Sequence, residues 1–217
     1  LHSSNKDSEI KGLVYDTERY VAMICLPIVA MTFVWSSEII LVFISKEFLE
    51  ATNILKILVL VALIRVLNRP WSVALRGSDR PDLTSILSVI MGILSIILML
   101  LLIPKRIPQL GLENLGGMGG EGAAYAVLIS DLIGGLMLRI LCYNYLHIVP
   151  RFNILLQIFV ASLVCAIMWQ LQLSIEIDRW FELFFISGLG GLLFLSILSA
   201  IGVFTRRDFI FFSNILN

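Results

Sequence analysis

Residues 54–75 read ILKILVLVALIRVLNRPWSVAL, an apolar run that is long enough to cross a membrane and yet carries two arginines within it. An α-helix rises about 1.5 Å per residue, so about 20 apolar residues cross the roughly 30 Å of hydrocarbon in a bilayer. An isolated guanidinium at that depth costs at least about 2.5 kcal/mol. Arg65 and Arg69 therefore require acidic partners or access to water.

Five further apolar stretches fill most of the rest of the chain. They cover residues 20–43, 83–103, 123–145, 154–171 and 181–204. Apolar residues make up 59% of the sequence, against about 45 to 50% in ordinary globular proteins. The mean hydropathy is +0.95. Six such stretches joined by mostly short loops predict an all-α, polytopic membrane protein with six transmembrane helices.

Three segments follow from this pattern. Residues 1–19 are predicted to form a cytoplasmic N-terminal segment, residues 20–145 a group of four spans, and residues 146–217 two more spans and a cytoplasmic tail. Positively charged loops are retained in the cytoplasm, and the N-terminal side holds more Lys and Arg near the span ends than the opposite side. The two sets are Lys6, Lys11, Arg19, Arg76, Arg80, Arg151, Arg206 and Arg207, against Lys46, Lys105, Arg106 and Arg179. Both ends are thus predicted to lie in the cytoplasm, in a multi-pass protein of the cytoplasmic membrane.

Arg65, Arg69 and Arg76 form a cationic stripe along the second stretch. They recur at positions i, i+4 and i+11, which keeps them within about 40° of one another around a helix. Guanidinium forks match the oxygens of phosphate groups. The stripe indicates a wet cavity wall that binds a phosphate or pyrophosphate. The alternative is a structural pair with an acidic residue of another helix.

Asp131 and Pro70 are the other candidate site residues. Asp131 lies about 12 Å into the fourth stretch by helical rise, at a depth comparable to that of Arg65. It is a candidate counter-charge for the arginines, or alternatively a site that couples transport to a proton or sodium ion. Pro70 frees the carbonyl of Val66 and kinks the helix, which makes it a candidate hinge.

Small residues recur at helical spacing in two of the stretches. They are Thr84, Ser88, Gly92 and Ser95 in one stretch, and Ala126, Ser130 and Gly134 in the next. Such stripes let helix backbones approach closely in lipid. We expect both to mark packing faces.

The sequence offers little that would support catalysis. It contains no Ser-His-Asp set, no paired catalytic carboxylates and no HExxH motif, and its three cysteines form no CxxC pair. His2 and His147 are lone residues of predicted loops, so a zinc site is not expected. The formal net charge is zero, which gives no electrostatic reason to expect nucleic acid as a partner. We expect no enzyme activity, no catalytic residues, no metal and no cofactor.

Three segments, taken in order, carry a resemblance to a known family. They read YVAMICLPIVAMTFVWSSEIILVFISKEFLEATNILKIL, VALRGSDRPDLTSILSVIMGILSIILMLLLIPK and GEGAAYAVLISDLIGG, and cover residues 20–58, 73–105 and 120–135. This order resembles the C-terminal half of a polysaccharide flippase of the O-antigen and exopolysaccharide type. That family belongs to the superfamily that also holds multidrug and toxic-compound extrusion proteins. The loop of residues 104–122 is longer than is usual there, and an N-terminal half is absent from the sequence.

The resemblance implies one lobe of a twelve- to fourteen-helix transporter. Such a transporter moves an oligosaccharide linked to a lipid pyrophosphate across the cytoplasmic membrane by alternating access, for lipopolysaccharide or exopolysaccharide biosynthesis. The implied partners are this lipid-linked oligosaccharide, membrane lipid, the N-terminal half of the same transporter and a polysaccharide polymerase. The family has no invariant motif for the cargo, so the role of Arg65, Arg69 and Arg76 is an inference from their positions.

Three alternatives stay open. A cation-coupled drug efflux protein of the same superfamily would require acidic residues in its cavity, whereas this chain offers Asp131 against several arginines at depth. A membrane glycosyltransferase or polymerase of the same pathway would require large catalytic loops outside the membrane. A non-transporting assembly subunit is the third.

Overall fold

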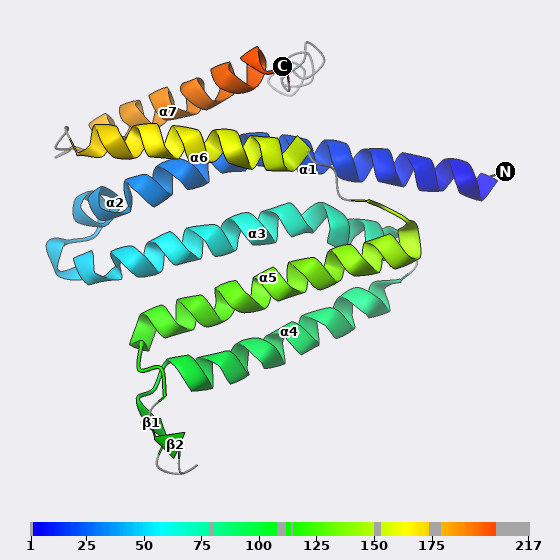
Figure 1. Ribbon diagram of the computed structural model, residues 1–217, viewed down its shortest axis with the longest axis horizontal. Coiled ribbons are helices and arrows are strands. Elements are labelled where there is room, and N and C mark those ends of the chain that lie inside the picture. Colours follow the sequence, from blue (N-terminus) through cyan, green and yellow to red (C-terminus); the bar gives the residue numbers. More distant parts are fainter. Residues whose placement is uncertain are drawn as a thin grey trace. The chain divides into compact units, whose positions relative to one another are not determined.

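The computed structural model describes residues 2–78, 80–107, 112–113, 115–149, 153–173 and 179–202, and nearly all of them are helical. The helices are α1 (His2–Val34), α2 (Ser36–Phe43), a short 3-10 turn η1 (Lys46–Ala51), α3 (Thr52–Gly77), α4 (Pro81–Leu102), α5 (Gly119–Leu146), α6 (Asn153–Gln172) and α7 (Trp180–Ala200), as Figure 1 shows. Strands β1 (Arg106–Ile107) and β2 (Leu112–Glu113) pair as a two-residue antiparallel ribbon. The predicted all-α class is confirmed.

Within the described residues, five helices are long and apolar enough to cross a membrane. They are Ile10–Val34 of α1, α4, α5, Ile154–Gln172 of α6 and α7. The chain is therefore a polytopic membrane protein. Helix α3 is also long enough, at 26 residues, but its four cations separate it from the other five. The polar side chains of α3 need protein or water around them, because hydrocarbon offers them no hydrogen bonds.

The first predicted stretch, residues 20–43, differs most from the observed helices. Helix α1 already begins at His2, so the segment predicted to precede the first span is helical and continues into that span without a break. Helix α1 ends at Val34, and α2 starts after Trp35, whose side chain is fully buried.

The predicted orientation depends in part on Arg151, Arg206 and Arg207, which lie outside the described residues. The cytoplasmic placement of both ends stays a prediction.

The chain divides into two compact units. Unit 1 comprises Leu1–Val21 and Glu50–Arg151, and unit 2 comprises Ala22–Leu49 and Phe152–Asn217. This grouping cuts across the predicted four-span segment 20–145, because residues 22–49 pack with the C-terminal helices. In unit 2, for example, the rings of Phe43 and Phe184 meet edge to face with centroids 6.4 Å apart.

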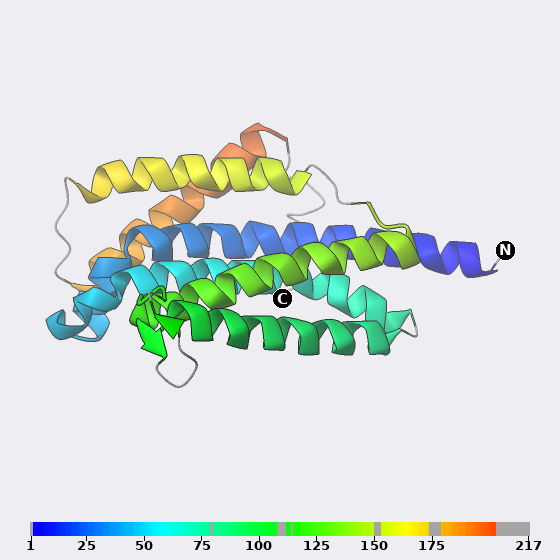
Figure 2. The ribbon, with the colours of Figure 1, turned by 60° about the horizontal axis from the view of Figure 1, so that its bottom comes forward.

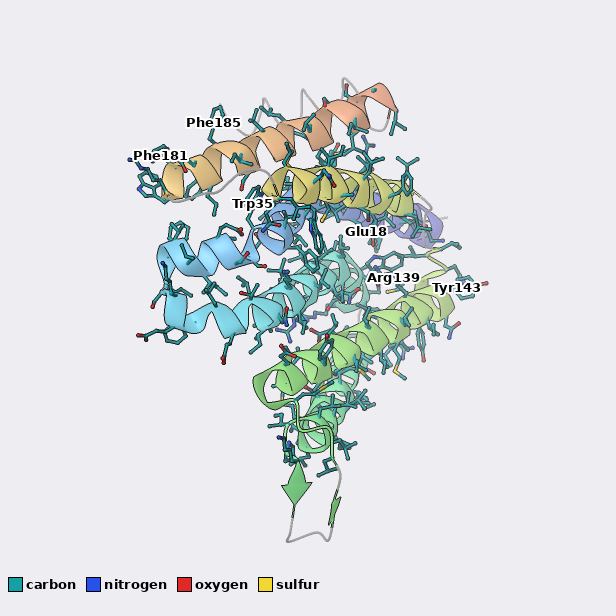
Figure 3. The ribbon with its side chains drawn as sticks, turned by 60° about the vertical axis from the view of Figure 1, so that its left-hand side comes forward. Glu18, Trp35, Arg139, Tyr143, Phe181 and Phe185 are labelled. Atoms are coloured by element: carbon teal, nitrogen blue, oxygen red, sulfur yellow. The ribbon has the colours of Figure 1, made fainter. Side chains whose placement is uncertain are left out.

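Unit 2 combines a packed interior with an apolar outer surface. Phe194 and Leu198 of α7 are fully buried, whereas Phe181 and Phe185 stand out from the same helix (Figure 3). The carboxylate of Glu38 accepts hydrogen bonds from Nε2 of Gln172 at 2.9 and 3.0 Å. Exposed aromatic rings of this kind suit a surface that faces lipid.

Unit 1 is built around α5, which lies between α3 and α4 (Figure 1, Figure 2). A cluster of buried side chains joins α1, α3 and α5 at one end of this unit. It consists of Val14, Trp71, Ala74, Leu75, Leu138, Cys142 and Ile148. Because α5 contacts both of the other helices along its length, it fixes the positions of the polar residues on α3 and α4.

Close approach between α4 and α5 depends on small residues of α5. The Ser130 hydroxyl donates a hydrogen bond to the Met91 carbonyl at 2.8 Å, and a Cβ placed on Gly134 would lie 3.0 Å from the Met91 side chain. The α5 stripe thus packs against α4, as small residues in membrane helices allow. A Cβ on Gly92 would meet no described atom within 4 Å, so the α4 stripe does not pack in the same way at this position.

We expect Gly122→Ala to destabilise the protein. A Cβ at this position would lie 2.7 Å from the carbonyl oxygen of Leu102, and overpacking against backbone costs about 1 to 3 kcal/mol. Gly92→Ala is the matched control, because it gains helix propensity and enters open space. Thermal unfolding of the detergent-solubilised protein measures both changes. An equal midpoint for the two variants would contradict the close contact between α4 and α5.

Candidate functional site

Two of the predicted site residues form an ion pair in unit 1. The Arg65 Nε of α3 donates to the Asp131 Oδ2 of α5 at 2.6 Å. The Arg65 side chain is 62% exposed and that of Asp131 is 21% exposed. The two residues, which the sequence places at comparable depths, are in contact. The Arg65 side of the pair remains accessible. Ion coupling through Asp131 stays a prediction.

Arg69 differs from Arg65 in having an uncompensated charge. It lies one helical turn further along α3 and is exposed. Within the described part of the chain, Arg69 has no hydrogen-bond or ion-pair partner. Arg76 is exposed in the last turn of α3, where the helix dipole stabilises a positive charge. Its Nη2 donates a hydrogen bond to the Ser72 hydroxyl at 3.1 Å. The three arginines of the stripe therefore have three different environments.

A polar groove of about 460 Å³ opens between α3, α4 and α5. Two cations and one carboxylate line it, together with several hydroxyl groups and one amide. The polar lining residues are Arg65, Asn68, Arg69, Ser72, Thr84, Ser88, Ser95, Ser130 and Asp131. The α4 stripe, which the sequence suggested as a packing face, contributes Thr84, Ser88, Gly92 and Ser95 to this groove.

A second groove, of about 560 Å³, lies between α3 and residues 10–21 of α1. Its lining is almost entirely apolar and includes no carboxylate. The lining residues are Ile10, Leu13, Val14, Thr17, Val21, Arg65, Val66, Arg69, Pro70, Val73, Ala74 and Gly77. Arg65 and Arg69 line both grooves, so the charged face of α3 borders a polar space and an apolar space.

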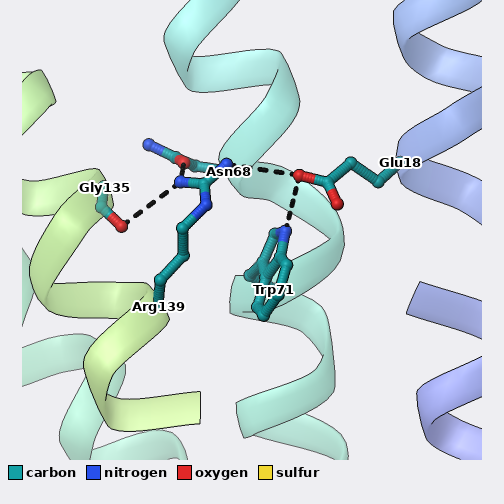
Figure 4. Close-up of polar contacts among 5 residues, drawn as sticks. All are labelled: Glu18, Asn68, Trp71, Gly135 and Arg139. Atoms are coloured by element: carbon teal, nitrogen blue, oxygen red, sulfur yellow. Dashed lines mark hydrogen bonds and ion pairs between the residues drawn. The ribbon is translucent and has the colours of Figure 1, made fainter. Parts of the chain in front are cut away.

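A buried polar cluster supports this arrangement (Figure 4). The Oε1 of Glu18, on α1, accepts hydrogen bonds from Nε1 of Trp71 at 2.9 Å and from Nη2 of Arg139 at 3.2 Å. The Nη1 of Arg139 donates to the Oδ1 of Asn68 at 2.6 Å and to the Gly135 carbonyl at 3.3 Å. Glu18 is only 5% exposed. The cluster ties α1, α3 and α5 together within unit 1 and orients Asn68 beside the polar groove.

Glycine at position 135 is required for this cluster. A Cβ there would lie 2.5 Å from the Nδ2 of Asn68, so the Asn68 side chain reaches Arg139 by crossing the bare backbone of α5. The Arg139 guanidinium also lies 5.3 Å from the centroid of the Trp71 ring. A partly desolvated guanidinium gains from such a ring in addition to its hydrogen bonds.

Helical periodicity and depth do not predict the Glu18–Arg139 pair. Glu18 falls in the segment 1–19 that is predicted to precede the first span, and Arg139 falls within the stretch 123–145. The sequence does hold one signal, because Val14 and Glu18 are four residues apart and so share a face of α1. The structure buries both side chains. A carboxylate on the apolar face of a membrane helix predicts a cation in a neighbouring helix.

Pro70 is buried in α3 and lines the apolar groove. Helix α3 continues through it from Thr52 to Gly77, and a hinge at this point stays a prediction.

Within the described residues, no three His, Cys, Asp or Glu side chains come close enough to hold a metal ion. The three cysteines are free thiols.

We expect Glu18→Ala to destabilise the protein by about 2 to 3 kcal/mol, because it leaves the Arg139 guanidinium, which is only 25% exposed, without its counter-charge. The double variant with Gln at positions 18 and 139 removes both charges, and it should recover part of the loss. Asp131→Ala is the control, because Arg65 is exposed, and it should cost less. Thermal unfolding in detergent measures all three, and an equal loss for Glu18→Ala and Asp131→Ala would exclude the special role of the buried pair.

Unit 1 thus presents a paired arginine, an unpaired arginine, a hydroxyl-lined groove and an apolar groove around one helix. These groups are suited to binding a molecule that carries a negative charge, hydrogen-bonding groups and a hydrocarbon part.

The resemblance to polysaccharide flippases rests on the three quoted segments alone. No protein-family model, no curated protein and no solved structure matches this chain.

Proposed function

We propose that this chain is part of a membrane transporter that moves an oligosaccharide linked to a lipid pyrophosphate from one leaflet of the cytoplasmic membrane to the other. In this proposal the polar groove of unit 1 receives the charged headgroup, and the chain works with an N-terminal half of the same transporter. The observation that carries the proposal is the uncompensated charge of Arg69 on the wall of a hydroxyl-lined groove.

The charge balance of the groove favours an anion. Its lining contains the guanidinium groups of Arg65 and Arg69 and the single carboxylate of Asp131, so one positive charge is left over. The carboxylate is already bonded to Arg65. A pyrophosphate would neutralise the remaining charge through charge-assisted hydrogen bonds, which are stronger than neutral ones.

The remaining lining suits a sugar. Several hydroxyls of the groove already donate to backbone carbonyls, as Ser88 does to Thr84 at 2.8 Å and Ser130 to Met91 at 2.8 Å. Each hydroxyl oxygen can still accept a hydrogen bond. The O–H of a serine or threonine can also rotate away from the carbonyl and donate to a ligand. A groove of this size, with many polar groups that accept and donate, fits the hydroxyls of an oligosaccharide better than an apolar drug.

A cation-coupled drug efflux protein is the second candidate, and Asp131 is the observation that favours it. A cationic drug would bind a free carboxylate, whereas the carboxylate of Asp131 accepts a hydrogen bond from Arg65 at 2.6 Å. Two guanidinium groups beside the same space would repel a cation. The lipid-linked anion is therefore the better supported cargo.

We expect Arg69→Ala to weaken binding of undecaprenyl diphosphate by roughly tenfold or more, because a charge-assisted hydrogen bond contributes about 1.5 to 3 kcal/mol. Arg69→Lys should keep part of the affinity, since the charge remains while the planar fork is lost. Binding is measured on the whole protein in nanodiscs, and surface polysaccharide is measured in cells at equal protein levels.

Arg80→Ala is the matched control for this experiment. Arg80 lies outside both grooves, with its guanidinium 5.5 Å from the centroid of the Tyr145 ring. Unchanged binding and unchanged surface polysaccharide in the Arg69 variants would refute the proposal. Binding of ethidium that depends on Asp131 and not on Arg69 would instead support the drug efflux alternative.

A further inference from the structure

We infer that the apolar groove between α1 and α3 holds the hydrocarbon chain of the transported lipid, with the lipid's phosphate against Arg69. This inference rests on the proposed function for the identity of the cargo, and it adds a second binding surface to the site. One amphiphile would then contact both sides of α3's charged face, with its headgroup in the polar groove and its chain in the apolar groove.

The lining of the apolar groove matches a hydrocarbon chain. On α1 the lining residues run from Ile10 to Val21, and on α3 they run from Arg65 to Gly77, with Arg69 among them. These ranges cover eleven and twelve residue steps, or about 16 and 18 Å of helix. Two stripes of similar length, apolar except for Thr17 and the two arginines, form an elongated groove along the helices, and that shape suits a chain better than a compact ligand.

Small side chains on α3 leave the space for this chain. Pro70, Ala74 and Gly77 lie on the groove side of the helix, and a Cβ on Gly77 would meet no described atom within 4 Å. Val73 is 57% exposed there, and Leu13 of α1 is 69% exposed. An apolar ligand in the groove would cover both side chains, and burial of apolar surface is favourable.

The charge at the edge of the groove selects among possible occupants. A purely apolar partner, such as another helix, would cover Arg69 without compensating its charge, and burial of an unpaired charge is costly. A free phosphate would compensate the charge and leave the apolar lining uncovered. A lipid with a phosphate at the head of its chain does both, because Arg69 lines the two grooves at once.

Photolabelling of the whole protein in nanodiscs tests this inference. The probe is a polyprenyl diphosphate with a diazirine in its hydrocarbon chain, and labelled residues are identified by mass spectrometry. We expect labels on Leu13, Val66 and Val73, which line the groove. Phosphatidylglycerol with the same diazirine should label these residues much less. Equal labelling by the two lipids would overturn the inference, since it would reveal a general lipid surface.

A substitution that fills the groove provides the second measurement. Val73→Trp should reduce labelling by roughly tenfold, because the indole displaces several methylene groups of the chain. Val89→Trp on α4 is the matched control: Val89 is 62% exposed and lies outside both grooves. Leu13→Trp fills the groove from α1 and replaces Val73→Trp if that variant fails to fold.

The outcomes separate this inference from the proposed function. If Arg69→Ala abolishes binding of the cargo but the labels fall outside the groove, the chain does not bind here and the proposed function still holds. Labelling of the groove that survives both Val73→Trp and Leu13→Trp would also overturn the inference. If Arg69→Ala changes neither binding nor labelling, the inference and the proposed function both fail.

Discussion

A guanidinium group within a membrane helix must be hydrogen-bonded or hydrated, and unit 1 depends on this constraint. Arg139 meets it through Glu18, Asn68 and the Gly135 carbonyl, and these contacts connect three helices. Replacing a buried ion pair by apolar residues is often neutral or stabilising, whereas breaking one is costly. The pair therefore contributes mainly to the choice of one arrangement of α1, α3 and α5, and both grooves depend on that arrangement.

The arginines of unit 1 differ in how completely their neighbours satisfy them. Arg139 has three oxygen acceptors and an aromatic ring, Arg65 has one carboxylate and an open side, and Arg69 has no partner in the described residues. Satisfied charges hold structure, while an unsatisfied charge at the wall of a groove is a candidate for binding a ligand. For this reason the proposed function assigns the phosphate of the cargo to Arg69 and not to Arg139.

The two grooves give α3 two sides with different chemical surroundings. One side of its charged face borders hydroxyl groups of α4 and α5, and the other borders the apolar residues of α1. A lipid-linked sugar has the same division between a polar head and an apolar chain. Because Arg65 and Arg69 line both spaces, the junction between head and chain would lie beside these two guanidinium groups.

Composition and periodicity alone were sufficient for the all-α class, for the long helices and for the depth match between Arg65 and Asp131. Each of these depends on a single stretch or on distance from a helix end. The Glu18–Arg139 contact joins residues 121 apart in sequence, and the lining of the polar groove by Ser88 and Gly92 depends on how closely α5 approaches α4. Only the tertiary structure decided these, because helical periodicity says which residues share a face and not which face meets which neighbour.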